Sequence, residues 1–262
     1  MVVEATEMSA EASGEEYWRE LLTGESDAVL KLRRAFGRLP SPPRCKLCQA
    51  PFRGPLAPLL NLIGYGPWAL NRQLCRVCLR KTSSHHGGAE LEVTLVFSDV
   101  RGSTTLGERL RPAEFRKLID RFFNIAFKAV DAEDGVVDHI AGDGVMAMWI
   151  PGFAGPHAPA RAVSAARSLT AAASEIGIPV GTGVHTGVAF VGIVGGEGAG
   201  KEFTVLGDTA NTAARVGSAA AAGEALVSGA VAAAAEVKTE DLEHRQLALK
   251  GKAELFDVWV LT

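Results

Sequence analysis

The segment LEVTLVFSDVRGST, residues 91–104, carries the pattern on which the fold assignment depends. Its first half alternates apolar and mixed positions, which predicts a half-buried β-strand. That strand would deliver Asp99 to its C-terminal end, where the sites of α/β proteins tend to lie. The turn after it offers the backbone N–H groups of Gly102, Ser103 and Thr104 at the start of a helix. A carboxylate followed by such a turn is typical of metal and phosphate sites.

An apolar stripe then predicts one helix over residues 105–133, and the segment GVVDHIAGDGVMAMW, residues 135–149, comes after it. This segment predicts two short strands joined by a hairpin turn, and Asp-Gly is in itself a common turn sequence. If the hairpin pairs with the first strand, however, Asp143 lies beside Asp99. Two carboxylates that close repel each other unless cations lie between them, and magnesium accepts carboxylates together with substrate phosphates.

The glycine-rich segment GGEGAGKEF, residues 195–203, fits most of the phosphate-loop pattern G-x-x-x-x-G-K-[S/T]. Glu202 stands where that pattern needs a magnesium-binding hydroxyl, and a phosphate loop must be followed by a helix. Here the flanking residues 188–194 and 201–206 are rich in β-branched and aromatic side chains. We therefore interpret the segment as the turn between two strands.

Composition limits the class of protein. The chain has 262 residues with a net charge of −3, which argues against a general nucleic-acid binder. We find no apolar run long enough to span a membrane, and the acidic N-terminus lacks the apolar core of a signal peptide. These features predict a cytoplasmic protein.

All four cysteines occur in two C-x-x-C pairs: Cys45, Cys48, Cys75 and Cys78. In a reducing compartment two such pairs favour a structural zinc ion held by four thiolates. Buried thiols or a redox pair are the alternatives, and His85 and His86 are outside candidates for a fourth ligand.

Composition and the positions of glycine- and proline-rich stretches divide the chain into four parts. Residues 1–40 form an N-terminal helical segment with amphipathic helices broken near Gly24, and residues 41–82 form the zinc-binding module. Residues 83–90 are a polar hinge. Residues 91–262 form the main domain.

Three motifs in order, FSDVRGST, HIAGDG and TVLGDTANTAAR, resemble the catalytic domain of class III adenylate and guanylate cyclases over residues 92–261. The cysteine module followed by HGGAE looks like the N-terminal module of a bacterial subgroup of these enzymes. The resemblance implies a ferredoxin-like α/β (α+β) fold and a head-to-tail homodimer with two composite sites. It also implies cyclisation of a nucleoside triphosphate with release of pyrophosphate.

The same resemblance assigns roles to particular residues. Two magnesium or manganese ions would bind Asp99, Asp143 and the carbonyl of Val100 from one subunit. The other subunit would supply Asn211, which orients the ribose, and Arg215, which stabilises the transition state; the two are four residues apart and so share a helix face. Further candidates for substrate contact are the turn residues Gly102, Ser103 and Thr104, and Lys250 and Lys252 for the triphosphate, although these lysines equally fit a solvated basic turn.

Base recognition departs from the family pattern. Adenylate cyclases of this class commonly carry a lysine where this chain has His139, whereas Thr204 matches a threonine variant of the second base-recognising position. Strand alternation places the neighbouring Asp138 on the opposite face of the sheet from His139. We expect ATP as substrate. A guanylate cyclase, or a regulatory domain that holds nucleotide without turning it over, are the alternatives.

Overall fold

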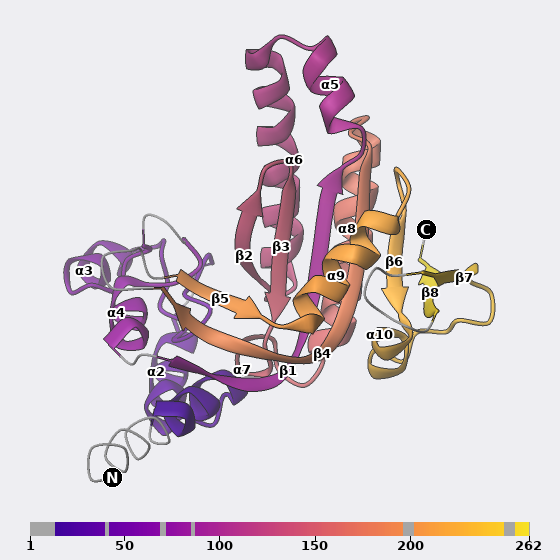
Figure 1. Ribbon diagram of the computed structural model, residues 1–262. Coiled ribbons are helices and arrows are strands. Elements are labelled where there is room, and N and C mark those ends of the chain that lie inside the picture. The colour runs from indigo at the N-terminus through magenta and orange to yellow at the C-terminus, as the bar shows by residue number, and fades with distance from the viewer. Residues whose placement is uncertain are drawn as a thin grey trace. The chain divides into compact units, whose positions relative to one another are not determined.

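The computed structural model describes residues 14–39, 42–68, 72–84, 87–195, 202–248 and 255–261 (Figure 1). The described residues fall into two compact units. The first contains the chain up to Leu91 together with Pro151–Gly155 and Phe190–Thr204. The second contains Glu92–Ile150, Pro156–Ala189 and Val205–Thr262.

A mixed sheet is the framework of the fold. Among the described residues its strands run in the order β2-β3-β1-β4-β6-β8-β7, and β5 pairs with β4. β4 pairs with β6 in parallel, whereas β1–β3, β2–β3, β6–β8 and β7–β8 are antiparallel. The strands are β1 (Gly87–Val100), β2 (Val136–Ala141), β3 (Gly144–Trp149), β4 (Val180–Val194), β5 (Glu202–Leu206), β6 (Ala225–Ser228), β7 (His244–Leu247) and β8 (Phe256–Val260). The predicted strand before Asp99 and the predicted hairpin β2–β3 are therefore confirmed.

The single helix expected over residues 105–133 is wrong. The structure has α5 (Ser103–Arg109) and α6 (Pro112–Ala132), separated by two residues with extended backbone. Pro112 explains the break, because proline disfavours the helical conformation in the residue before it. Proline is itself well suited to the first position of a helix, where its missing N–H costs nothing.

Helices of the second unit cover both faces of the sheet. On one face α8 (Ala158–Glu175) packs beside α6, and Thr170 of α8 bonds to Thr182 of β4 (3.0 Å). Thr182 in turn bonds to Ser98 of β1 (2.9 Å). The neighbouring residue on β4, Gly183, faces α9 (Asp208–Ala219), which Figure 1 shows on the near side of the sheet. The short helix α10 (Gly229–Ala234) follows β6, whereas α7 (Pro151–Ala154), which follows β3 in the chain, belongs to the first unit.

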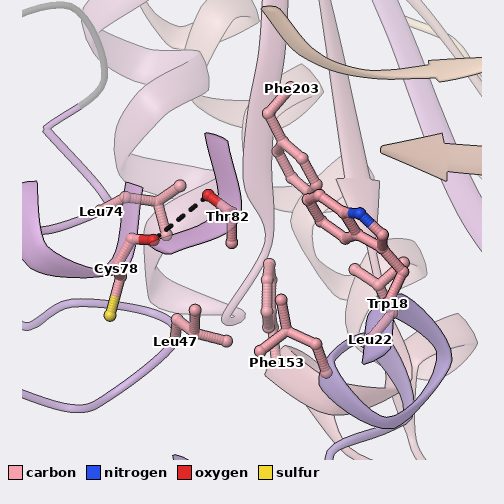
Figure 2. Close-up of a pocket in the computed structure, with 9 residues that line it drawn as sticks. Trp18, Leu22, Leu47, Leu74, Cys78, Thr82, Phe153 and Phe203 are labelled. Carbon is pink, nitrogen blue, oxygen red and sulfur yellow. Dashed lines mark hydrogen bonds between the residues drawn. The ribbon is translucent and has the colours of Figure 1, made fainter. Parts of the chain in front are cut away.

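The first unit has its own core. It contains a helix at residues 14–23, α2 (Asp27–Gly37), α3 (Ala57–Leu62) and α4 (Arg76–Ser84), and the chain breaks between the first two near Gly24, as predicted. Trp18 is fully buried and stacks on Phe203, with ring centroids 6.1 Å apart and planes at 12°. Figure 2 shows the apolar side chains that surround this pair.

The space between those side chains is about 10 Å³, enough for a single water molecule at most. Thr82 of α4 donates to the carbonyl of Cys78 beside it (3.2 Å), as the dashed line in Figure 2 marks. The region is therefore packed core and no ligand pocket.

Arg33 of α2 adds a polar link, because it donates to the carbonyls of Lys46 (2.9 Å) and Leu47 (2.8 Å) in the cysteine module.

Candidate functional site

Two acidic residues lie at the adjoining ends of neighbouring strands. Asp99 is the penultimate residue of β1 and lies opposite Gly144 of β3, so that a Cβ on Gly144 would be 3.5 Å from the Cβ of Asp99. Asp143 occupies the turn just before Gly144, and its carbonyl accepts a hydrogen bond from the backbone N–H of Val100 (3.3 Å). The predicted neighbourhood of Asp99 and Asp143 thus follows from the register of β1 and β3.

The electrostatics of Asp99 fit a cation. Its side chain is 20% exposed, and its Oδ1 atom is buried without a hydrogen-bond partner, although Nη1 of Arg101 lies 3.1 Å away as an ion-pair partner. Burial raises the pKa of Asp99; the charge of Asp143 also raises it, and Arg101 opposes both. A divalent cation would bind Oδ1 as one of its ligands and would offset the repulsion between the two carboxylates.

Arg101 is a further residue of this site, and it is not among the residues predicted from the sequence. Its backbone N–H donates to the carbonyl of Pro179 (2.6 Å), and its guanidinium donates to the carbonyls of Gly217 and Ser218 (3.2 Å to Ser218) at the end of α9. Arg101 therefore links the acidic pair to the helix that carries the predicted Asn211 and Arg215. Its partners on α9 lie more than a hundred residues away in the chain, so no local spacing could reveal them.

The turn after Asp99 has the expected form. Gly102 has φ 65°, in the left-handed region that favours glycine, and α5 begins at Ser103. The side chain of Ser103 is half-buried and that of Thr104 is exposed.

Helix α9 presents Asn211 and Arg215 away from the core. They are four residues apart, Asn211 is exposed and Arg215 is half-buried. The opposite face of α9 is buried through Thr209, Thr212, Ala213, Val216 and Gly217. Asn211 and Arg215 therefore lie where a second chain could approach. The other residue of this motif, Thr204, is half-buried in β5.

The expected position of Asp138 is wrong. The pairing of β2 with β3 shifts between Val137 and His139, so Asp138 is an extra residue in the strand. Such a β-bulge interrupts the alternation of side chains on which the expectation depended. The Oδ2 atom of Asp138 consequently lies 2.7 Å from Nδ1 of His139.

The four cysteines form one cluster in the first unit. Their sulfur atoms all lie within 4.8 Å of one another, and the Sγ atoms of Cys48 and Cys75 are 3.8 Å apart. Four thiolates at the usual Zn–S distance form a tetrahedron with edges of about 3.8 Å. Backbone N–H groups also donate to two of the sulfurs, from Cys75 to Cys45 (3.3 Å) and from Cys78 to Cys75 (3.4 Å).

Ionisation of these thiols is strongly interdependent. Burial opposes ionisation of Cys45, yet hydrogen bonds from Cys48, Cys75 and Cys78 outweigh it and bring the pKa of Cys45 well below its usual range. Hydrogen bonds to Cys45 and the other two sulfurs raise the pKa of Cys78 far above its usual range. Without a cation only part of the cluster can be thiolate, whereas a metal ion would allow all four. The residues present therefore fit a tetrahedral metal site.

Four of the predicted residues lie outside the described residues: His85, His86, Lys250 and Lys252. None of the helices in the described part of the chain is long and apolar enough to cross a bilayer.

The chain belongs to the adenylate and guanylate cyclase family, since residues 88–262 match the family described as "Adenylate and Guanylate cyclase catalytic domain". The fold agrees. The crystal structure of the adenylyl cyclase CyaB from P. aeruginosa superimposes with a TM-score of 0.58 at 26% sequence identity, covering 66% of this chain and 95% of that one. The guanylyl cyclase Cya2 gives the same TM-score at 25% identity, covering 66% of this chain and 93% of that one.

Among curated proteins, adenylate cyclase 1 of Rhizobium meliloti (strain 1021) is 34% identical over 147 residues, which is 51% of this chain and 22% of that protein. The chain thus spans less than a quarter of the length of that relative. The predicted family and its mixed α/β fold are confirmed by these comparisons. They support a nucleotidyl cyclase and leave the choice between ATP and GTP open.

Proposed function

We propose that this chain is an adenylate cyclase, which converts ATP to 3′,5′-cyclic AMP and pyrophosphate at the interface of a homodimer. The observation that carries the proposal is the register of β1 and β3, which brings Asp99 close to Asp143 and leaves a buried oxygen of Asp99 without a hydrogen-bond partner. The relatives named adenylate cyclase add support.

In the proposed site, Asp99, Asp143 and the carbonyl of Val100 hold two magnesium or manganese ions. The ions would lower the pKa of the ribose 3′-hydroxyl and offset charge on the phosphates. The backbone and hydroxyl groups of the turn, Gly102, Ser103 and Thr104, bind the phosphates. We retain Lys250 and Lys252 as candidates for contact with the triphosphate.

The partner subunit supplies the remaining groups. Asn211 orients the ribose for in-line attack of the 3′-oxygen on the α-phosphorus. Arg215 offsets negative charge that grows on the phosphoryl oxygens, for which a fixed guanidinium is better suited than an ammonium. His139 and Thr204 contact the base.

The homodimer has a direct test. The variants Asp99→Ala and Arg215→Ala should each be inactive because each removes one half of every composite site. Mixing them should restore about a quarter of wild-type activity, since half of the randomly formed dimers contain one intact site of two. Two inactive variants that stay inactive when mixed, although they exchange subunits, would contradict the composite site.

Guanylate cyclase activity is the second candidate, because His139 replaces the usual lysine and because the likeness to the guanylyl cyclase Cya2 equals that to CyaB in TM-score. Rates with ATP and GTP at equal concentration decide between them. A regulatory domain without turnover is the third candidate. The retained acidic pair argues against it, and nucleotide binding without any cyclic product would support it.

We also propose that Cys45, Cys48, Cys75 and Cys78 hold one structural zinc ion, in a module over residues 41–82 that is distinct from the segment 1–40 and joined by a hinge at 83–90 to a catalytic domain at 91–262. Both ATP and reduced thiols are found in the cytoplasm, where we place the protein. Zinc content is tested by metal analysis of protein purified without chelators: one zinc per chain is expected, and metal-free, folded protein would contradict it.

A further inference from the structure

The β-bulge brings the side chains of Asp138 and His139 into contact. The carboxylate of Asp138 is fully buried, whereas the side chain of His139 is 38% exposed. Oδ2 of Asp138 and Nδ1 of His139 are 2.7 Å apart, the distance of a short charge-assisted hydrogen bond. An aspartate directly before a histidine in a regular strand would point to the other face and could not make this bond.

The register of the sheet places His139 on the same face as Asp99. His139 lies opposite Met146 of β3, and Met146 lies opposite Phe97 of β1. Residues directly opposite each other on antiparallel strands share a face, and so do residues two apart in one strand. The imidazole is therefore on the face of the sheet that also carries the acidic pair.

The hydrogen bond decides how the imidazole can act. An ionised carboxylate only accepts hydrogen bonds, so Nδ1 must carry the hydrogen. In a neutral ring Nε2 is then an acceptor, and in a protonated ring Nε2 is a donor. Protonation of the ring therefore changes Nε2, at the far end of the side chain, from a hydrogen-bond acceptor to a donor.

We propose that Asp138 is a positioning residue for base selection: it fixes the tautomer of His139 so that Nε2 is the atom that contacts the hydrogen-bonding edge of the purine. This inference rests on the proposed nucleotide site and adds to it how the histidine that stands in place of the lysine presents its ring to the base. Adenine presents an acceptor at N1 beside the amino donor at N6, whereas guanine presents a donor at N1 beside the acceptor O6. The state of Nε2 therefore affects the two purines differently.

Asp138→Asn is the informative variant. The amide has nearly the same shape as the carboxylate, but it can also donate, so it no longer requires hydrogen on Nδ1. In the serine-protease triad the same type of change preserves the geometry and gives the wrong tautomer. We expect the ratio of ATP affinity to GTP affinity to change by about tenfold, the effect of one hydrogen bond to a base.

Two measurements test the proposal without requiring turnover. Nitrogen-15 NMR of histidine-labelled protein, at a pH where the ring is neutral, reports which nitrogen of His139 carries the hydrogen. Calorimetry with 3′-deoxy-ATP and 3′-deoxy-GTP in the presence of magnesium reports affinity for nucleotides that cannot cyclise. The matched control is Asp257→Asn, because Asp257 contacts Nε2 of His244 (2.9 Å) on the distant strands β7 and β8.

The proposal predicts hydrogen on Nδ1 in the wild type, its loss in Asp138→Asn, and a changed affinity ratio in that variant but not in Asp257→Asn. In a His139→Ala background Asp138→Asn should leave the ratio unchanged, because the partner through which it acts is gone. Hydrogen on Nε2 in the wild type, or a ratio shift that persists without His139, would overturn the inference.

The outcome also separates this inference from the proposed function. Selective binding that depends on Asp138, with no cyclic product from ATP or GTP, would overturn the cyclase proposal and leave base selection standing. Failure of the metal-loaded wild type to bind either nucleotide would overturn both.

Discussion

Gly183→Ala should displace the helix that carries Asn211 and Arg215. A Cβ on Gly183 would lie 2.5 Å from the Cα of Gly217 and 2.6 Å from the carbonyl carbon of Val216, both backbone atoms of α9. Ordinary contact begins at 3.4 Å. Because backbone atoms cannot rotate aside, α9 has to move from the sheet by about 1 Å if the methyl group is to fit.

This displacement has two measurable consequences. Forcing a methyl group into a packed interface costs about 1–3 kcal/mol, which urea or thermal unfolding would detect. A misplacement of about 1 Å in groups that act on the transition state can lower the rate about a hundredfold. We therefore expect a large fall in the rate of cyclic nucleotide formation in protein that is still folded.

Gly37→Ala is the matched control, since a Cβ on Gly37 would meet nothing within 4 Å. Removing a glycine from a helix should leave activity unchanged and, if anything, stabilise the protein by up to about 1 kcal/mol. If Gly183→Ala matched the control in both stability and activity, α9 would not be held against the sheet through this contact and the reasoning would be refuted.

Three further predictions concern the stability of each unit. Hydrogen bonds from Arg245 lower the pKa of Glu224, so Glu224→Gln should lower the free energy of unfolding by about 1 kcal/mol near neutral pH. This difference from the wild type should disappear as the pH falls through the lowered pKa and Glu224 becomes protonated. A difference that stays constant down to low pH would contradict this. Cys45→Ser should lower zinc content and the melting temperature of the module, which metal analysis and calorimetry measure; full zinc retention would count against the four-thiolate site. Trp18→Ala removes a fully buried ring stacked on Phe203 and should destabilise the first unit by about 3–5 kcal/mol in urea unfolding, with a loss under 1 kcal/mol speaking against this core.

The acidic pair was predictable because it depends on local patterns. Alternation identified the strand before Asp99, and the Gly-Asp-Gly turn identified the hairpin that carries Asp143. The glycine-rich segment was also correctly read as lying between two strands, since β4 and β5 pair. Its own residues 196–201 lie outside the described part of the chain.

Features that depend on a distant partner could not be predicted in the same way. The bulge at Asp138 exists only in the register with β3, so alternation within β2 gave the wrong side for its carboxylate. The contact of Arg101 with the end of α9 and the stacking of Trp18 on Phe203 join residues far apart in the sequence. The break at Pro112 was visible in the sequence, but the apolar stripe running through it suggested one helix.

The central claim is that Asp99 and Asp143 support cyclisation of a nucleotide. Its most direct test is to incubate the purified chain with ATP or with GTP, in magnesium or manganese, and to measure cyclic nucleotide beside the variant Asp99→Ala. We predict cyclic AMP from the wild type and none from the variant. A folded dimer that binds ATP and forms no cyclic product from either nucleotide would contradict the claim.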